Sequence, residues 1–124
     1  MTQIPITKQT FDLEDRTLTF SKNVIRFCKQ LKQDTINREL ISQLIRSSGS
    51  VGANYREAND ALSKKDFGHR IRIARKEAKE TQYWLQLLAE AASSEPNGDL
   101  KGLLQEASEL KNILSSIAQK VPRV

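Results

Sequence analysis

The chain has 124 residues, of which 20 are Lys or Arg and 15 are Asp or Glu, so its net charge is +5 at neutral pH. This length suits one domain around a single hydrophobic core, and a single cysteine excludes a framework of internal disulfides. No apolar run approaches the roughly 20 residues that a membrane-spanning helix needs, and the polar N-terminal stretch lacks the apolar core of a signal peptide. We therefore expect a soluble, cytoplasmic protein.

The first half of the chain predicts an extended arm over residues 1–9 and two amphipathic helices, at about residues 11–32 and 38–59. Thr10 is the expected N-cap of the first helix and Asn37 that of the second. Apolar or small residues recur at intervals of three and four, as on the buried face of a helix. The expected core positions are Leu13, Thr17, Phe20, Val24, Phe27 and Leu31, then Ile41, Leu44, Ser48, Val51, Tyr55, Ala58 and Leu62.

Two glycines interrupt the second helix, within residues 47–53. Each costs about 1 kcal/mol relative to alanine in a helix interior. Either the helix breaks here into a loop, or the small side chains let a neighbouring backbone approach closely, as the pairs Ser48 and Gly52 or Gly49 and Ala53 would allow. The three-and-four spacing continues on both sides, which favours the continuous helix.

The third predicted helix spans residues 64–92, and Ser63 is its expected N-cap. A main seam of core positions runs along it, and a second stripe contains large apolar residues beside it. That stripe is either part of one broad buried face or a contact between subunits, where aromatic residues are favoured. The candidate contact residues are Ile73, Tyr83, Trp84 and Leu87.

A connection rich in helix-breaking residues follows at 93–99. A fourth amphipathic helix is expected at about 99–121, with core residues in a heptad pattern. Four such helices with short connections predict an all-α protein, an antiparallel up-down four-helix bundle that forms one domain over residues 1–124.

The excess positive charge lies within residues 64–79, which carry seven basic and two acidic residues; the rest of the chain has 13 of each. Four pairs of like charges stand three or four residues apart, each unfavourable by roughly 0.2 to 0.5 kcal/mol. The alternative is a solvated helix face, but we favour an anionic partner, with phosphate the first candidate. The candidate nucleic-acid contacts are Lys64, Lys65, Arg70, Arg72, Arg75, Lys76 and Lys79.

The sequence offers no group of residues for catalysis, a metal or a cofactor. His69 is the only histidine, so the paired Glu-x-x-His pattern of di-metal bundles is absent. Cys28 is expected to be a buried thiol. Most aromatic residues fall on the core seams, so base stacking is not expected either. We therefore predict a protein that is not an enzyme and that binds neither metal nor cofactor.

Residues 47–58 read Ser-Ser-Gly-Ser-Val-Gly-Ala-Asn-Tyr-Arg-Glu-Ala, and later segments include Lys65-Asp66-Phe67 and Tyr83-Trp84-Leu85. Together these segments resemble the four-helix-bundle family of proteins encoded in intervening sequences of 23S ribosomal RNA genes. The same fold family includes the accessory variability determinant of diversity-generating retroelements. The chain departs from the family's Ala-Asn-Ile-x-Glu-Gly motif at Tyr55 and Ala58, which leaves its branch open.

The resemblance implies a homopentameric barrel of bundles, in which Ser48, Gly52 and Asn54 serve packing and assembly. For the retroelement branch it implies binding to nucleic acid and to a reverse transcriptase, whereas the role of the ribosomal branch is poorly defined. Our hypothesis is a non-enzymatic, oligomeric accessory protein that binds RNA, DNA or both. The alternative is a protein-interaction scaffold whose basic helix docks onto an acidic partner.

Overall fold

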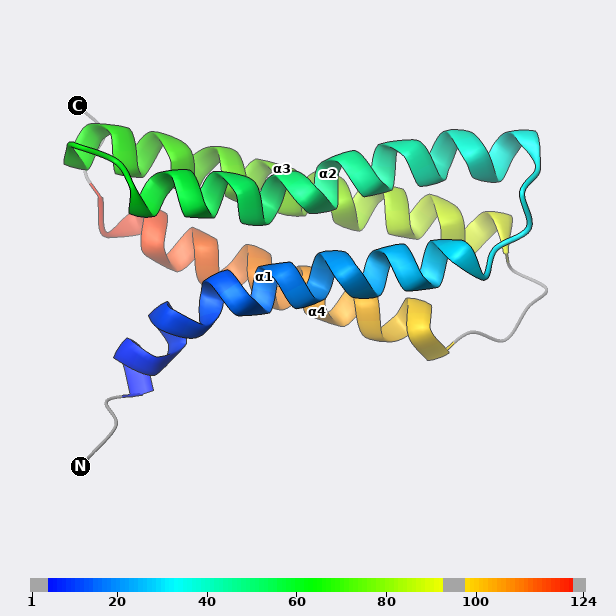
Figure 1. Ribbon diagram of the computed structural model, residues 1–124, viewed down its shortest axis with the longest axis horizontal. Coiled ribbons are helices and arrows are strands. Elements are labelled where there is room, and N and C mark those ends of the chain that lie inside the picture. Colours follow the sequence, from blue (N-terminus) through cyan, green and yellow to red (C-terminus); the bar gives the residue numbers. More distant parts are fainter. Residues whose placement is uncertain (1–4, 93–97, 122–124) are drawn as a thin grey trace.

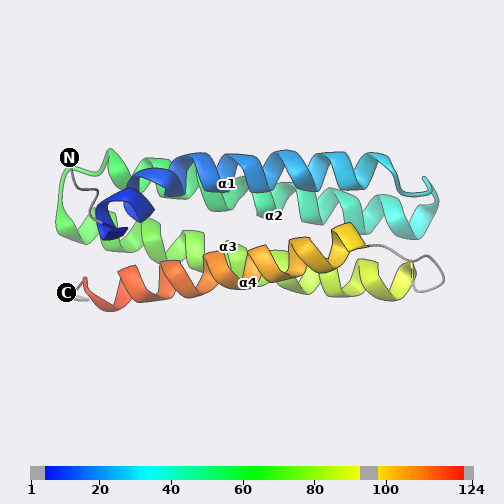
Figure 2. The same ribbon diagram turned by 90° about the horizontal axis from the view of Figure 1, so that it is seen from below.

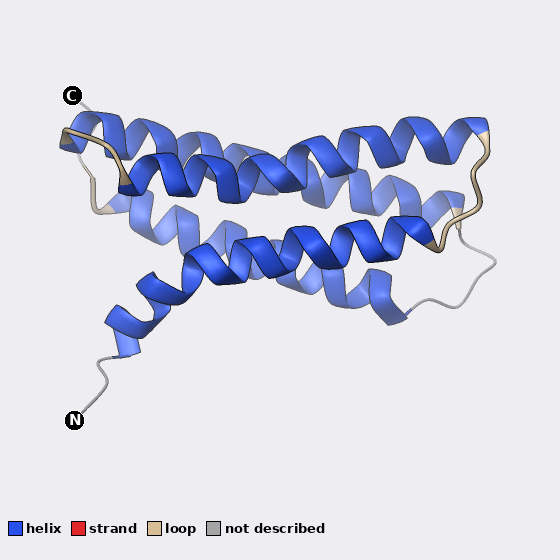
Figure 3. Ribbon diagram, in the orientation of Figure 1, coloured by secondary structure: helices blue, strands red, loops and turns tan. Residues whose placement is uncertain are grey.

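Every regular element of the described residues is an α-helix (Figure 3). The computed structural model describes residues 5–92 and 98–121. The helices are α1 (Pro5–Lys29), α2 (Thr35–Asn59), α3 (Lys64–Ala91) and α4 (Gly98–Gln119). The predicted all-α class with four helices is thereby confirmed for this part of the chain. No helix in it is both long and apolar enough to cross a bilayer.

The four helices lie side by side along the long axis of the molecule, and the chain reverses direction from each helix to the next (Figure 1). α2 and α3 form the most extensive contact, whereas α1 and α4 touch least. Seen from below in Figure 2, α1 and α2 form one layer and α3 and α4 form the other. Each helix therefore packs on two others around one shared core.

α1 begins at Pro5, so the predicted extended arm is wrong over residues 5–9 and Thr10 is not an N-cap. Proline suits the first turn of a helix, because its fixed φ is helical and its missing N–H would have no partner there. Residues 1–4 of the arm lie outside the described part. At its other end α1 stops at Lys29, three residues earlier than predicted, where Gln30 N–H turns back to the Phe27 carbonyl (3.0 Å).

α2 begins at Thr35 with Asp34 as its N-cap, not Asn37 as predicted. The Asp34 carboxylate accepts a hydrogen bond from the Asn37 backbone N–H at 2.8 Å. The Asn37 side chain is buried and donates instead to the Lys32 carbonyl (2.9 Å). Asn37 thus lies in the first turn and ties it to the preceding loop.

The predicted continuous helix through Gly49 and Gly52 is confirmed. A Cβ added at Gly52 would lie 2.9 Å from Thr17 Oγ1, whereas one at Gly49 would meet nothing within 4 Å. Close by, the Ser21 hydroxyl donates to the Ser48 carbonyl at 3.1 Å. Gly52 therefore sets the close approach of α1 to α2, while Gly49 faces outward.

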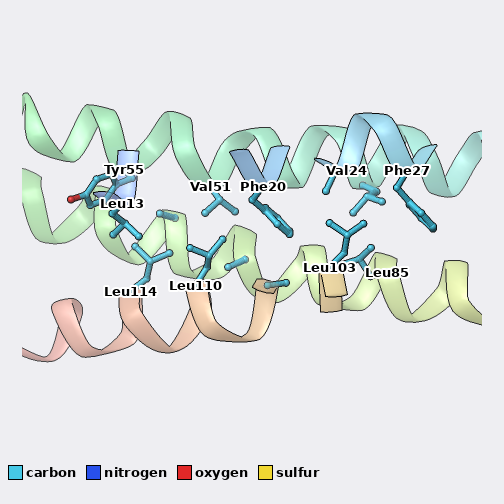
Figure 4. Close-up of a cluster of buried hydrophobic side chains, with 14 of the residues drawn as sticks. Leu13, Phe20, Val24, Phe27, Val51, Tyr55, Leu85, Leu103, Leu110 and Leu114 are labelled. Carbon is cyan, nitrogen blue, oxygen red and sulfur yellow. The ribbon is translucent and has the colours of Figure 1, made fainter. Parts of the chain in front are cut away.

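The core follows the predicted seams of all four helices. Two buried threonines satisfy their hydroxyls within their own helices: Thr17 donates to the Leu13 carbonyl (2.9 Å), and Thr81 to the Glu77 carbonyl (2.8 Å). Leu62 is the exception: it was expected in the core but is 98% exposed, because α2 ends before it at Asn59. The buried side chains labelled in Figure 4 are Leu13, Phe20, Val24, Phe27, Val51, Tyr55, Leu85, Leu103, Leu110 and Leu114.

Candidate nucleic-acid interface

α3 carries the basic residues because its sequence places a core seam on one side and charge on the other. The helix starts where Ser63 was predicted to cap it, with the Ser63 hydroxyl accepting from the Asp66 N–H at 3.1 Å. One side is buried, through residues such as Ile71, Ala78 and Leu85. The opposite side is left to solvent.

On that opposite side, six residues follow one another at alternating intervals of four and three, so that they form one line along the helix. We call this line the outer stripe. All of its residues are exposed except Arg72, which is half-buried. With a rise of 1.5 Å per residue, the stripe is about 27 Å long. Its members are Lys65, His69, Arg72, Lys76, Lys79 and Tyr83.

The lysines of the outer stripe form no ion pair within residues 5–92 and 98–121. Among the described residues, every ion pair uses Arg16, Arg46 or Arg56, and none uses Lys65, Lys76 or Lys79. These lysines therefore keep their full charge available to a ligand.

Two acids of α3 near the stripe share one arginine of α2. Arg46 of α2 reaches Glu77 at 3.4 Å and Glu80 at 3.0 Å. Both carboxylates are thus held toward α2. One arginine offsets only one of these two negative charges, and the exposed Asp66 adds another. The four cations of the stripe outnumber these acids, so the field remains positive although reduced.

Two of the seven predicted contacts serve the bundle itself. Arg70 stands about 160° around the helix from Arg72, and its guanidinium donates to the Asn54 side chain of α2 at 3.2 Å. Arg72 donates to the Val121 carbonyl just beyond α4, at 2.7 Å. Gly68 makes room for this bond, since an added Cβ would lie 2.8 Å from both Arg72 Nη1 and Val121 Cγ1.

The remaining two predicted contacts flank the stripe. Lys64 is exposed at the start of α3, beside a small hollow that Phe67 and Val121 also line. Arg75 is half-buried and faces a groove farther along the helix. The structure therefore gathers five of the seven cations around one face, separates Arg70, and commits part of Arg72 to α4.

The groove beside the stripe has a volume of about 690 Å³. Tyr83 and Trp84 meet at its end edge to face, with ring centroids 5.2 Å apart and an interplanar angle of 70°. Tyr83 is 55% exposed; Trp84 packs against the core, and its enclosed Nε1–H finds no acceptor among the described residues. The groove is lined by Arg72, Arg75, Lys76, Lys79, Glu80, Tyr83 and Trp84.

A larger hollow of about 880 Å³ lies between α1 and α4. Arg16 at its wall is already paired: its guanidinium donates to Glu106 at 2.7 and 2.9 Å and to Glu109 at 2.7 Å. These bonds lower the pKa of Glu109, after the larger effect of its hydrogen bond from Gln105, and raise that of Arg16. Asp15 and Asp99 add negative charge to the same lining. The hollow therefore joins two helices and is not the better anion site.

The predicted subunit-contact residues lie next to the stripe, and their role remains a prediction. Ile73, Trp84 and Leu87 are half-buried, and Tyr83 is exposed. Cys28 is buried in α1, and burial raises the pKa of its thiol to about 11. No group of three or more His, Cys, Asp or Glu side chains in the described ranges is arranged to hold a metal ion.

The sequence model of the family described as 23S rRNA-intervening sequence protein matches residues 9–116. The chain belongs to this family. A solved structure from Bacteroides thetaiotaomicron, described as a protein with unknown function from the S23 ribosomal protein family, is also similar. It has 32% sequence identity and a TM-score of 0.74, covering 85% of this chain and 96% of that one. A comparison with curated proteins finds no match.

Two residues of the outer stripe, His69 and Tyr83, were not among the predicted nucleic-acid contacts. Tyr83 was predicted as a subunit contact, and it is exposed at the end of the stripe. The available signal was the spacing, because Tyr83 stands four residues after Lys79 and so continues the line of cations.

Proposed function

We propose that this family member is a non-enzymatic accessory protein that binds nucleic acid through the outer stripe of α3. The observation that carries the proposal is the line of three exposed lysines, Lys65, Lys76 and Lys79, which form no ion pair in the described part of the chain. The positive charges of Arg72 and Arg75 add to the electrostatic field of these lysines. Lysine binds phosphate as a point charge and carries little information about base sequence.

The proposal has a quantitative consequence for salt dependence. Each phosphate that the protein neutralises releases counterions, which gives a slope of about −0.9 in log affinity against log salt on duplex DNA and about −0.7 on single strands. Three lysines in one subunit therefore predict a slope of roughly −2 to −3. Assembly into a ring would repeat the stripe and steepen the slope.

The assembly and partner form part of the same proposal. Resemblance to the accessory variability determinant supports a homopentamer and, in a retroelement setting, a reverse transcriptase as partner. The half-buried apolar side chains of Ile73, Trp84 and Leu87 are the surface that we assign to subunit contact. The molar mass in solution measures the assembly independently of nucleic-acid binding.

The test compares two triple variants with equal net charge. One reverses the stripe (Lys65→Glu, Lys76→Glu, Lys79→Glu), and Arg72 is kept because of its bond to Val121. The control reverses three other exposed lysines, Lys22, Lys32 and Lys101.

We expect the stripe variant to lose binding to labelled RNA and DNA and to lose most of the salt slope, while the control variant keeps a slope close to that of the wild type. Fluorescence anisotropy at several salt concentrations measures both. Equal binding by the two variants would refute the proposal. An acidic protein partner that stays bound after nuclease treatment would favour the scaffold instead.

A further inference from the structure

We infer that the groove at the end of the outer stripe is a site for single-stranded nucleic acid, with Tyr83 as the surface on which an unpaired base stacks. This inference rests on the proposed function, since the lysines of the stripe would hold the backbone of the same strand.

Tyr83 lies in line with the cations. It follows Lys79 by four residues and Lys76 by seven, so the three lie within about 10 Å along the helix axis. All three side chains are exposed and line the same groove. A phosphate on either lysine therefore places the neighbouring base within reach of the tyrosine ring.

One edge of the Tyr83 ring already contacts Trp84 in the free protein. Trp84 packs against the core and meets Tyr83 edge to face at 5.2 Å, an arrangement that stabilises aromatic pairs. The enclosed Nε1–H of Trp84 shows that this ring is turned inward. Tyr83 is thus the solvent-facing ring and Trp84 its support.

The combination of exposed lysines with an exposed aromatic ring favours single-stranded over double-stranded nucleic acid. Cationic grooves with exposed aromatic rings bind single strands, because every unpaired base offers a face for stacking. In a duplex the bases already stack on one another, so a duplex can use the lysines but leaves the ring of Tyr83 unused. At about 3.4 Å per stacked nucleotide, the 27 Å stripe spans about eight nucleotides.

The experiment uses a single-stranded RNA of about 12 nucleotides and the duplex that it forms with its complement. Three proteins are compared: the wild type, Tyr83→Ala and Tyr83→Phe. Trp84 is the only tryptophan, so its fluorescence reports on the groove directly. Light scattering on each protein follows the mass in solution.

We expect Tyr83→Ala to weaken the affinity for the single strand by about 5- to 150-fold and to leave the affinity for the duplex unchanged. Tyr83→Phe should bind the single strand like the wild type. The single strand should quench Trp84 fluorescence in the wild type, and the duplex should not.

An equal effect of Tyr83→Ala on both ligands, or no effect on either, would overturn the inference. The proposed function would still stand in that case if the triple lysine variant loses binding. A changed molar mass of Tyr83→Ala would overturn it too, by assigning Tyr83 to a subunit contact. Failure of the wild type to bind either ligand would refute both proposals.

Discussion

The contact between α1 and α2 depends on the missing side chain of Gly52, and a single methyl group tests this. Changing Gly52 to Ala places a Cβ 2.9 Å from Thr17 Oγ1 and 3.2 Å from Thr17 Cβ. Thr17 is fully buried, and its hydroxyl donates to the Leu13 carbonyl at 2.9 Å. Rotation of the Thr17 side chain moves Oγ1 but leaves its Cβ in place, so the 3.2 Å contact remains and the helices must move apart.

Two opposing terms set the size of the effect. Replacing glycine by alanine inside a helix stabilises by about 1 kcal/mol, whereas forcing extra volume into a packed contact costs about 1 to 3 kcal/mol. At Gly49 only the first term acts, since the added Cβ meets nothing. Gly49→Ala should therefore raise the free energy of unfolding, and Gly52→Ala should lie about 1 to 3 kcal/mol below it.

Urea denaturation followed by helical circular dichroism measures both variants. A double-mutant cycle with Thr17→Ala isolates the contact, because removing Oγ1 should reduce the cost of Gly52→Ala by at least about 0.5 kcal/mol. The reasoning is wrong if Gly52→Ala stabilises the protein as much as Gly49→Ala does. It is also wrong if the cost of Gly52→Ala is the same with and without the threonine.

Two further predictions concern groups that the proposed function does not use. Arg16→Met should lower the free energy of unfolding by about 1 kcal/mol at neutral pH, because it removes the two hydrogen bonds to the half-buried Glu106. Gln105 first and Arg16 second lower the pKa of Glu109 in the folded state. The part due to Arg16 is present above the unfolded value of about 4.3 and is lost as the pH falls through the folded pKa. The difference between the two proteins should therefore shrink in acid, and a constant difference would contradict this. The pKa of Cys28 is raised to about 11, so at pH 8 about one thiol in a thousand is ionised and Ellman's reagent should label the folded protein far more slowly than the unfolded protein. Equal labelling rates would show that the thiol is not enclosed.

Helix type and core positions could be predicted because they depend on the local spacing of apolar residues. The same spacing correctly predicted that the second helix continues through Gly49 and Gly52. Cap residues were harder where several polar residues compete. The predicted N-cap Ser63 is confirmed. The prediction of Asn37 was wrong because Asp34, three residues earlier, supplies the capping carboxylate.

The candidate site was harder to predict because basic residues that are close in sequence can point to different sides of a helix. Successive residues point about 100° apart, which puts Arg70 on the side facing α2. Its partner Asn54, and the Val121 carbonyl that holds Arg72, come from other helices. Such partners depend on how far each helix is shifted along its neighbour, and the spacing within one helix contains no information on that shift.

The lysines of the outer stripe differ from the cations that form the ion pairs of the bundle. Every ion pair within the described residues joins two different helices, and every cation in these pairs is an arginine. Arginine can bind two carboxylate oxygens at once, as Arg16 does with Glu106. Lys76 and Lys79 take part in none of these pairs, and they repel each other at three-residue spacing. Since they take no part in the ion pairs between helices and repel each other slightly, the proposed ligand of opposite charge would account for their alignment.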